Sequence, residues 1–170
     1  MTAPKPASVA DHEASHAVVW WWWWASQPEA RDPGTGRNIW RITIEPEEGK
    51  EGCFEPDFLI YTNQTSDDKL CLKHECATGL AGPISDKMRK EKRPLHPSDE
   101  RKVERLANRF WPSSPEEADR FLADLRPKVE LFLKRPDVCA MVKGLKKALL
   151  ERKTLGHDDA VAAMEAARLR

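Results

Sequence analysis

The sequence predicts a mainly α-helical fold with a small β element (α+β), in which one H-E-x-x-H helix packs inside a helical bundle. Apolar stripes at helical spacing and helix-start signals recur through the second half of the chain. Only residues 40–45 alternate apolar and polar side chains as a half-buried strand does. The 170 residues suffice for one domain with its own core, and the negative mean hydropathy is typical of a soluble, helix-rich protein.

The run His12-Glu13-Ala14-Ser15-His16 is the motif that carries chemistry. Residues four apart lie on one helix face, so the two imidazoles can converge on one Zn²⁺ with bonds of about 2.0–2.1 Å. Glu13 is rotated by about 100° from His12, which sets its carboxylate beside the metal. There it can take a proton from a bound water whose pKa is lowered to about 7. The motif therefore favours a zinc hydrolase over a helix that carries two ordinary histidines.

The first helix is predicted over Val9–Trp24, after a disordered N-terminus of residues 1–8. Ser8 and Asp11 have the spacing of a capping box, which would begin the helix there. The apolar residues that follow His16 predict a buried helix, and a dry site strengthens the electrostatic interactions of a catalytic metal. Residues 9–170 are expected to form one domain, with a zinc-binding part over 9–110 and C-terminal helices over 114–170.

Five consecutive tryptophans, Trp20–Trp24, cover every face of the end of this helix. One interpretation is a core helix whose rings are covered by the C-terminal helices. The alternative is a contact surface for a homo-oligomer, a partner or a membrane surface. The run is too short to span a bilayer.

The β element is predicted from residues 40–45 and 53–60. Residues 25–37 carry prolines and glycines typical of a loop, and 46–52 is predicted to be a turn. Pro56 cannot donate a ladder hydrogen bond, so the second strand should lie at a sheet edge. An edge strand near a protease site could pair with an extended substrate backbone.

Five further helices are predicted from start signals and apolar stripes. Ser114 and Glu117 form a second capping-box pattern with proline at the first helical position, and Pro127 predicts a kink in the helix that follows. The predicted ranges are about 67–89, 98–110, 114–134, 136–153 and 158–168.

Two other clusters have ordinary explanations that the sequence favours. Cys71, His74 and Cys76 are poorly spaced for one metal, since positions 71 and 76 are about 140° apart on a helix. We expect packing thiols and a surface histidine, and all four cysteines are expected to be reduced. The basic run 87–93 is expected to be a solvated helix end. Lys plus Arg equals Asp plus Glu at 28 each, so no nucleic-acid partner is expected.

The chain is expected to be cytoplasmic or, through the tryptophans, membrane-peripheral. The sequence contains no apolar span of about 18 residues, and its N-terminus lacks a basic region followed by an apolar core. We therefore expect neither a transmembrane segment nor a secretory signal.

The order of motifs resembles the peptidase domain of the FtsH family of ATP-dependent membrane zinc proteases. Residues 12–19 are similar to that family's HEAGHA signature, 42–46 to its V-T-I-x-P strand, and Gly52 to the glycine that follows. Residues 79–83 stand where the family has an L-x-G-R-x-A-E-E helix. Ser98-Asp99 with Leu106-Ala107 resembles its N-D-x-x-x-A-T-x-x-A segment, and 149–155 its L-L-E-x-E-T-L ending.

This resemblance implies an FtsH-peptidase-like fold and a third zinc ligand at Asp99. A carboxylate oxygen binds zinc at about 2.0–2.2 Å and leaves a fourth position for water. The alternative for Asp99 is a first-turn acid that the helix dipole favours. Glu75 and Asp86 remain alternative carboxylate ligands.

Several positions depart from the family's pattern. Ser15 replaces a glycine, Ser98 replaces an asparagine, and Pro83, Ser85 and Asp86 replace an arginine and paired glutamates. We expect no ATPase domain within these 170 residues. We therefore expect a zinc metalloendopeptidase that cuts peptides or unfolded proteins, with a separate ATPase as an optional partner. The alternative is a catalytically silent relative that acts as a binding or regulatory partner.

Overall fold

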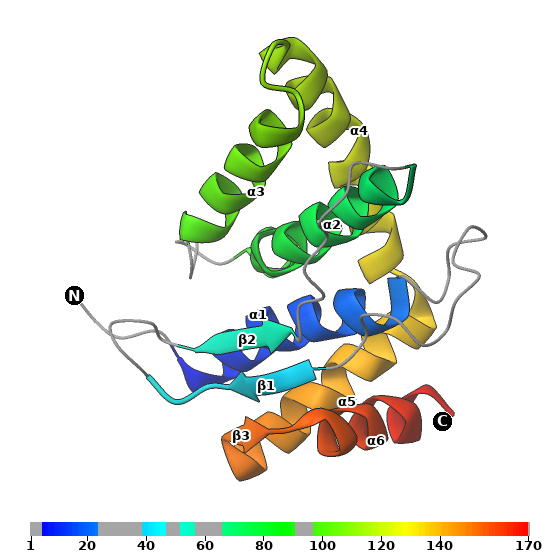
Figure 1. Ribbon diagram of the computed structural model, residues 1–170. Helices are drawn as coiled ribbons and strands as arrows, with labels where there is room; N and C mark the ends of the chain where they lie inside the picture. The colour runs from blue at the N-terminus through cyan, green and yellow to red at the C-terminus, as the bar shows by residue number, and fades with distance from the viewer. Residues whose placement is uncertain (1–4, 24–38, 47–51, 57–65, 91–96, 170) are drawn as a thin grey trace.

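The helix that carries the H-E-x-x-H motif lies at the centre of the protein. In the computed structural model, which describes residues 5–23, 39–46, 52–56, 66–90 and 97–169, this helix is α1 (Pro6–Val18). It packs between α2 (Ser66–Met88) on one side and α5 (Pro136–Arg152) on the other (Figure 1). Every residue from Val9 to Val18 is buried, including both histidines. The predicted buried helix is confirmed.

The start of α1 differs from the prediction. The helix begins at Pro6, and a proline suits the first turn because its missing N–H has no partner there in any helix. The capping box is wrong: Ser8 lies inside the helix, and the Asp11 carboxylate forms ion pairs with Lys146 and Arg89. The Asp11 side chain, which local spacing assigned to a helix cap, is therefore bound in ion pairs with residues that are distant in the sequence. Of the predicted disordered segment, residues 1–4 lie outside the described residues.

The tryptophan run does not continue the α-helix. Val19–Trp23 forms one turn of π-helix, labelled η1, which is wider than an α-turn. Trp20 and Trp23 are buried, whereas Trp21 and Trp22 are half-buried against the core. Trp24 lies outside the described residues.

Three elements cover these rings. Trp20 stacks on His74 of α2, with ring centroids 4.4 Å apart. Trp23 meets Phe132 edge-on at 5.0 Å, and the Arg168 guanidinium lies 4.7 Å from the Trp22 ring. The C-terminal helices therefore cover Trp22 and Trp23, as one interpretation predicted, and α2 covers Trp20.

A three-stranded antiparallel sheet lies beside α1, in the order β2-β1-β3. The strands are β1 (Ile39–Thr43), β2 (Cys53–Pro56) and β3 (Thr154–Leu155). Pro56 pairs with Ile39 on the edge strand β2, which confirms the predicted edge position. Strand β3 is not predictable from the sequence, because two residues are too few for an alternating pattern. Residues 57–60 of the predicted second strand lie outside the described residues.

The remaining helices lie within a few residues of their predicted ranges. Helices α3 and α4 form a hairpin above α2, and α6 packs beside α5 (Figure 1). Pro127 lies inside α4, and the Ser114 side chain makes no capping hydrogen bond although Pro115 starts that helix. The bounds are α3 Pro97–Phe110, α4 Pro115–Leu133 and α6 His157–Arg168. The mainly α-helical prediction with a small β element is confirmed.

Among the described residues, none of the helices is both long and apolar enough to cross a membrane.

Candidate metal centre

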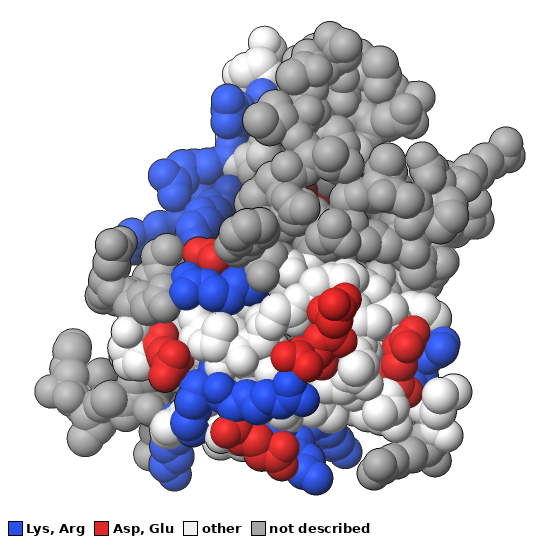
Figure 2. Space-filling view, turned by 60° about the horizontal axis from the view of Figure 1, so that its bottom comes forward, with Lys and Arg blue, Asp and Glu red and all other residues white. Residues whose placement is uncertain are grey.

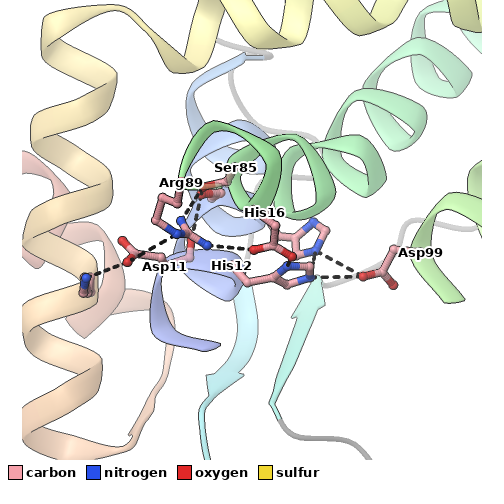
Figure 3. Close-up of polar contacts among 9 residues, drawn as sticks. Asp11, His12, His16, Ser85, Arg89 and Asp99 are labelled. Atoms are coloured by element: carbon pink, nitrogen blue, oxygen red, sulfur yellow. Dashed lines mark hydrogen bonds and ion pairs between the residues drawn. The ribbon is translucent and has the colours of Figure 1, made fainter. Parts of the chain in front are cut away.

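Three side chains from two parts of the sequence converge at one face of α1. The Nε2 atoms of His12 and His16 are 3.0 Å apart, and Asp99 Oδ2 from the first turn of α3 lies 3.2 Å from the first and 3.6 Å from the second (Figure 3). Tetrahedral coordination with bonds of about 2.0–2.1 Å sets neighbouring ligand atoms about 3.3–3.4 Å apart. The triangle of potential ligand atoms therefore has the size that one zinc ion requires.

The other ring nitrogens are held by acceptors. His12 Nδ1 donates to Asp86 Oδ2 at 2.8 Å, and His16 Nδ1 donates to the Thr78 carbonyl oxygen at 2.7 Å. A carboxylate and a carbonyl can only accept, so each neutral ring carries its hydrogen on Nδ1. Both Nε2 lone pairs then face the same space. This is the arrangement by which outer partners orient histidine ligands in metal sites.

Two lone pairs and a carboxylate at this separation repel one another unless a positive charge lies among them. Either a metal ion or a proton can supply that charge. All three side chains are largely withdrawn from water, and His12 is fully buried. The cluster therefore has the electrostatics, as well as the size, to hold a cation.

A second layer of polar residues fixes Asp86. Arg89 donates from Nη2 to Asp86 Oδ1 at 2.7 Å and from Nη1 to Ser85 Oγ at 2.7 Å (Figure 3). Ser15 Oγ lies 2.8 Å from Ser85 Oγ. Two of the positions that depart from the FtsH pattern, Ser15 and Ser85, thus contact each other and link α1 to α2.

Glu13 lies next to this cluster. It is 3% exposed and lines a pocket of about 270 Å³ together with His16 and Asp99. On the side of the sheet, a methyl group on Gly52 would come within 3.2 Å of Glu13 Cγ and 2.5 Å of Val9 Cγ1. The glycine thus lets the start of β2 approach α1 closely enough to enclose the carboxylate.

Gly82 of α2 lies close to the Nε2 atoms of both histidines. A Cβ atom at this position would come within 2.4 Å of His16 Nε2 and 2.5 Å of His12 Nε2. The structure explains why a glycine stands at position 82, since any side chain there would fill the space beside both Nε2 atoms.

The other candidate ligands lie elsewhere. Asp86 contacts the Nδ1 side of His12, away from the triangle, and Glu75 is not part of the cluster. Cys71, His74 and Cys76 form no potential metal group among the described residues. His74 is buried, contrary to the prediction of a surface histidine, and its Nε2 donates to the Trp20 carbonyl oxygen at 2.8 Å. Burial and nearby Glu75 raise the pKa of Cys76 to about 12, so it stays a thiol.

On the face drawn in Figure 2, Lys and Arg side chains gather at the upper left, and acidic and basic groups lie side by side over the lower part. The structure describes residues 87–90 of the basic run, which was predicted to be a solvated helix end. Lys87 pairs with Glu100 at 2.9 Å and Arg89 with Asp86 at 2.7 Å, so these two cations are matched by acids. Residues 91–93 of the basic run lie outside the described residues.

Comparisons with protein-family models and with curated proteins found no match for this chain. The functional interpretation therefore rests on the geometry of the site and on the motifs that the sequence contains.

The metal-free protein should lose stability as pH rises from 6.5 to 9. Burial opposes the charge on His12, but hydrogen bonds to Asp86 and Asp99 and the charge of Glu13 together raise its pKa from 6.5 to about 9. A pKa raised by folding gives stability that is complete below the unfolded pKa and lost as pH passes the folded one. The loss should reach up to about 3 kcal/mol, measured by denaturant unfolding after chelation. Chelated His12→Asn protein, which lacks the group, should show no such loss.

Proposed function

We propose that this protein is a zinc-dependent endopeptidase that hydrolyses peptides or unfolded protein segments. The observation that carries the proposal is the triangle of His12 Nε2, His16 Nε2 and Asp99 Oδ2 with sides of 3.0–3.6 Å. The oriented Nδ1 hydrogens support it, because they leave both Nε2 lone pairs available to one ion. The enclosed carboxylate of Glu13 in the same pocket adds the base that hydrolysis needs.

His12, His16 and Asp99 would hold the zinc, with Asp86 and the Thr78 carbonyl fixing the two rings. When bound, zinc would lower the pKa of a coordinated water and polarise the scissile carbonyl. Glu13 would accept the proton of the attacking water and pass it to the leaving amine. Because Glu13 is almost fully buried, bulk water does not weaken its interaction with the reacting atoms.

The substrate backbone would lie along β2. This strand is at the edge of the sheet, and its residues Cys53 and Phe54 line the pocket that contains Glu13. An extended peptide could add to this edge through main-chain hydrogen bonds and so present its carbonyl to the metal. A substrate-bound structure in which the peptide makes no pairing with residues 53–56 would exclude this path.

Metal analysis combined with a casein digestion assay tests the proposal. Wild-type protein purified with zinc should hold one ion per chain and degrade casein, and a chelator should abolish both. His16→Ala should lose both, since two ligands that remain cannot hold a catalytic ion firmly. His157→Ala is the matched control: His157 lies outside the site, where its Nδ1 accepts from the Ile39 N–H, so zinc and digestion should persist.

Two outcomes would contradict the proposal in different ways. Absence of stoichiometric zinc in wild-type protein would remove the metal site. One zinc per chain without turnover of any unfolded substrate would instead favour a catalytically silent binding protein built on the same helix.

A further inference from the structure

The pocket beside the metal centre extends to a carboxylate that the proposed chemistry does not use. Glu75 lines the pocket, and it shares one face of α2 with Thr78, Gly79 and Gly82. Gly82 abuts the two ligand nitrogens. Seven helical residues span about 10.5 Å, so Glu75 lies about 10 Å along α2 from the metal centre.

Glu75 has no counter-charge in the described part of the protein. Its carboxylate takes part in no hydrogen bond or ion pair there, unlike several neighbours on the same helix. Burial raises its pKa, and no opposing interaction lowers it. Partial desolvation of a carboxylate without a partner costs free energy. A cation that enters the pocket would offset this cost.

The walls between the metal centre and Glu75 are apolar. Trp20 and Phe54 line one part, and Val103 and Leu106 of α3 line another. The Trp20 ring is fixed by stacking on His74. An aliphatic stem fits such walls, and the faces of aromatic rings attract cations. Lysine and arginine combine a long apolar stem with a terminal positive charge.

The charged groups that face the pocket are Glu13, His16, Glu75, Asp99 and Lys102. Asp99 and His16 belong to the metal centre, and Glu13 is the proposed base. Lys102 lies at the rim, mostly exposed, with Nζ 3.4 Å from Asp99 Oδ1. Among these lining residues, Glu75 is therefore the one carboxylate that neither belongs to the metal centre nor acts as the proposed base.

We propose that this pocket binds a lysine or arginine side chain of the substrate next to the scissile bond, with Glu75 as its counter-charge. The inference rests on the proposed endopeptidase function and makes its substrate class specific. A pocket with these walls and a neutral residue at position 75 would select an aliphatic or aromatic side chain instead.

Matched peptides test the inference. Two fluorogenic series differ only at the residue before or after the scissile bond, which is lysine, norleucine or glutamate. In one series, kcat/KM for the lysine peptide should exceed that for the norleucine peptide by about tenfold, typical of one partly buried charge pair. Glu75→Gln should bring this ratio close to one, and Glu75→Lys should favour the glutamate peptide. Glu104→Gln, which removes an exposed carboxylate of α3, should leave the ratio unchanged.

A binding measurement separates this inference from the proposed function. Zinc-loaded Glu13→Gln protein is titrated calorimetrically with the same peptides, alone and combined with Glu75→Gln. Binding of the lysine peptide that depends on Glu75, without cleavage by wild type, would support the pocket and remove the endopeptidase function. Cleavage with equal ratios in wild type and Glu75→Gln would overturn the inference and leave the function standing. If the lysine peptide is neither cleaved nor bound, both the inference and the proposed function are overturned.

The melting temperature guards against a folding artefact. Glutamine keeps the shape of Glu75 and removes a desolvated charge, so Glu75→Gln should melt at or above the wild-type temperature. A clear decrease would mean that Glu75 stabilises the fold through a contact of its own, which would overturn its role as a vacant counter-charge.

Discussion

Glu13→Gln should retain one zinc ion per chain and lose peptide hydrolysis, with kcat lower by about 10²–10⁴-fold. Glutamine has the same shape as glutamate, so the close approach of the Glu13 side chain to Gly52 at the start of β2 is preserved. It cannot accept a proton at neutral pH, and the attacking water would then lack its base. The ligand atoms of His12, His16 and Asp99 are unchanged by this substitution. Metal analysis and single-turnover hydrolysis of a fluorogenic peptide measure the two effects separately.

Glu117→Gln is the matched control, because Glu117 is an exposed residue in the first turn of α4. That variant should keep both the metal and the activity. Full activity in Glu13→Gln would remove Glu13 as the base while leaving the metal centre intact. Loss of zinc in Glu13→Gln would show that the carboxylate supports the ligands and would leave its catalytic role unsupported.

Much of the fold followed from local patterns. Apolar stripes and proline starts located the helices from α2 to α6 within a few residues, because helix-forming signals act over short distances. The features that differ from the prediction depend on contacts between residues that are far apart in the sequence. Asp11 was assigned to a cap, but Lys146 of α5 and Arg89 of α2 take its carboxylate. The π-turn at Val19–Trp23 also has no local signature, because its rings pack against helices that are distant in sequence: Trp20 against α2, Trp23 against α4 and Trp22 against α6.

The site divides in the same way. His12, Glu13 and His16 are close in sequence, and helical periodicity alone predicts their shared location. Asp99 lies 87 residues from His12, and only the family resemblance pointed to it. The partners of the Nδ1 atoms were not predicted. Thr78 contributes a backbone carbonyl, which no residue type encodes, and Asp86 was considered only as a direct ligand. The one signal for this role in the sequence is an acidic residue, Asp86, shortly after the small residues 79–83.

Gly82→Ala should abolish zinc binding although it changes no ligand. The added methyl carbon would lie 2.4 and 2.5 Å from the two Nε2 atoms, whereas real Cβ contacts are essentially never under 3.0 Å. The imidazoles cannot turn away freely, because Asp86 and the Thr78 carbonyl hold their opposite nitrogens. Either α1 and α2 must separate or the rings must leave their partners. Overpacking of this kind costs about 1–3 kcal/mol. Metal affinity should fall by more than the 10–100-fold that loss of an outer partner costs.

Gly79→Ala on the same helix is the matched control for Gly82→Ala. A methyl group there would meet Val103 Cγ2 at 2.5 Å, which is a side-chain contact away from both histidines. Both variants should unfold at lower denaturant concentration than wild type, but only Gly82→Ala should lose zinc in calorimetric titration. The comparison separates the effect of filling the space beside the two Nε2 atoms from the effect of general strain between α2 and its neighbours. Equal zinc affinity in the two variants would mean that the ion does not lie between His12, His16 and Asp99 as the contacts at Gly82 require.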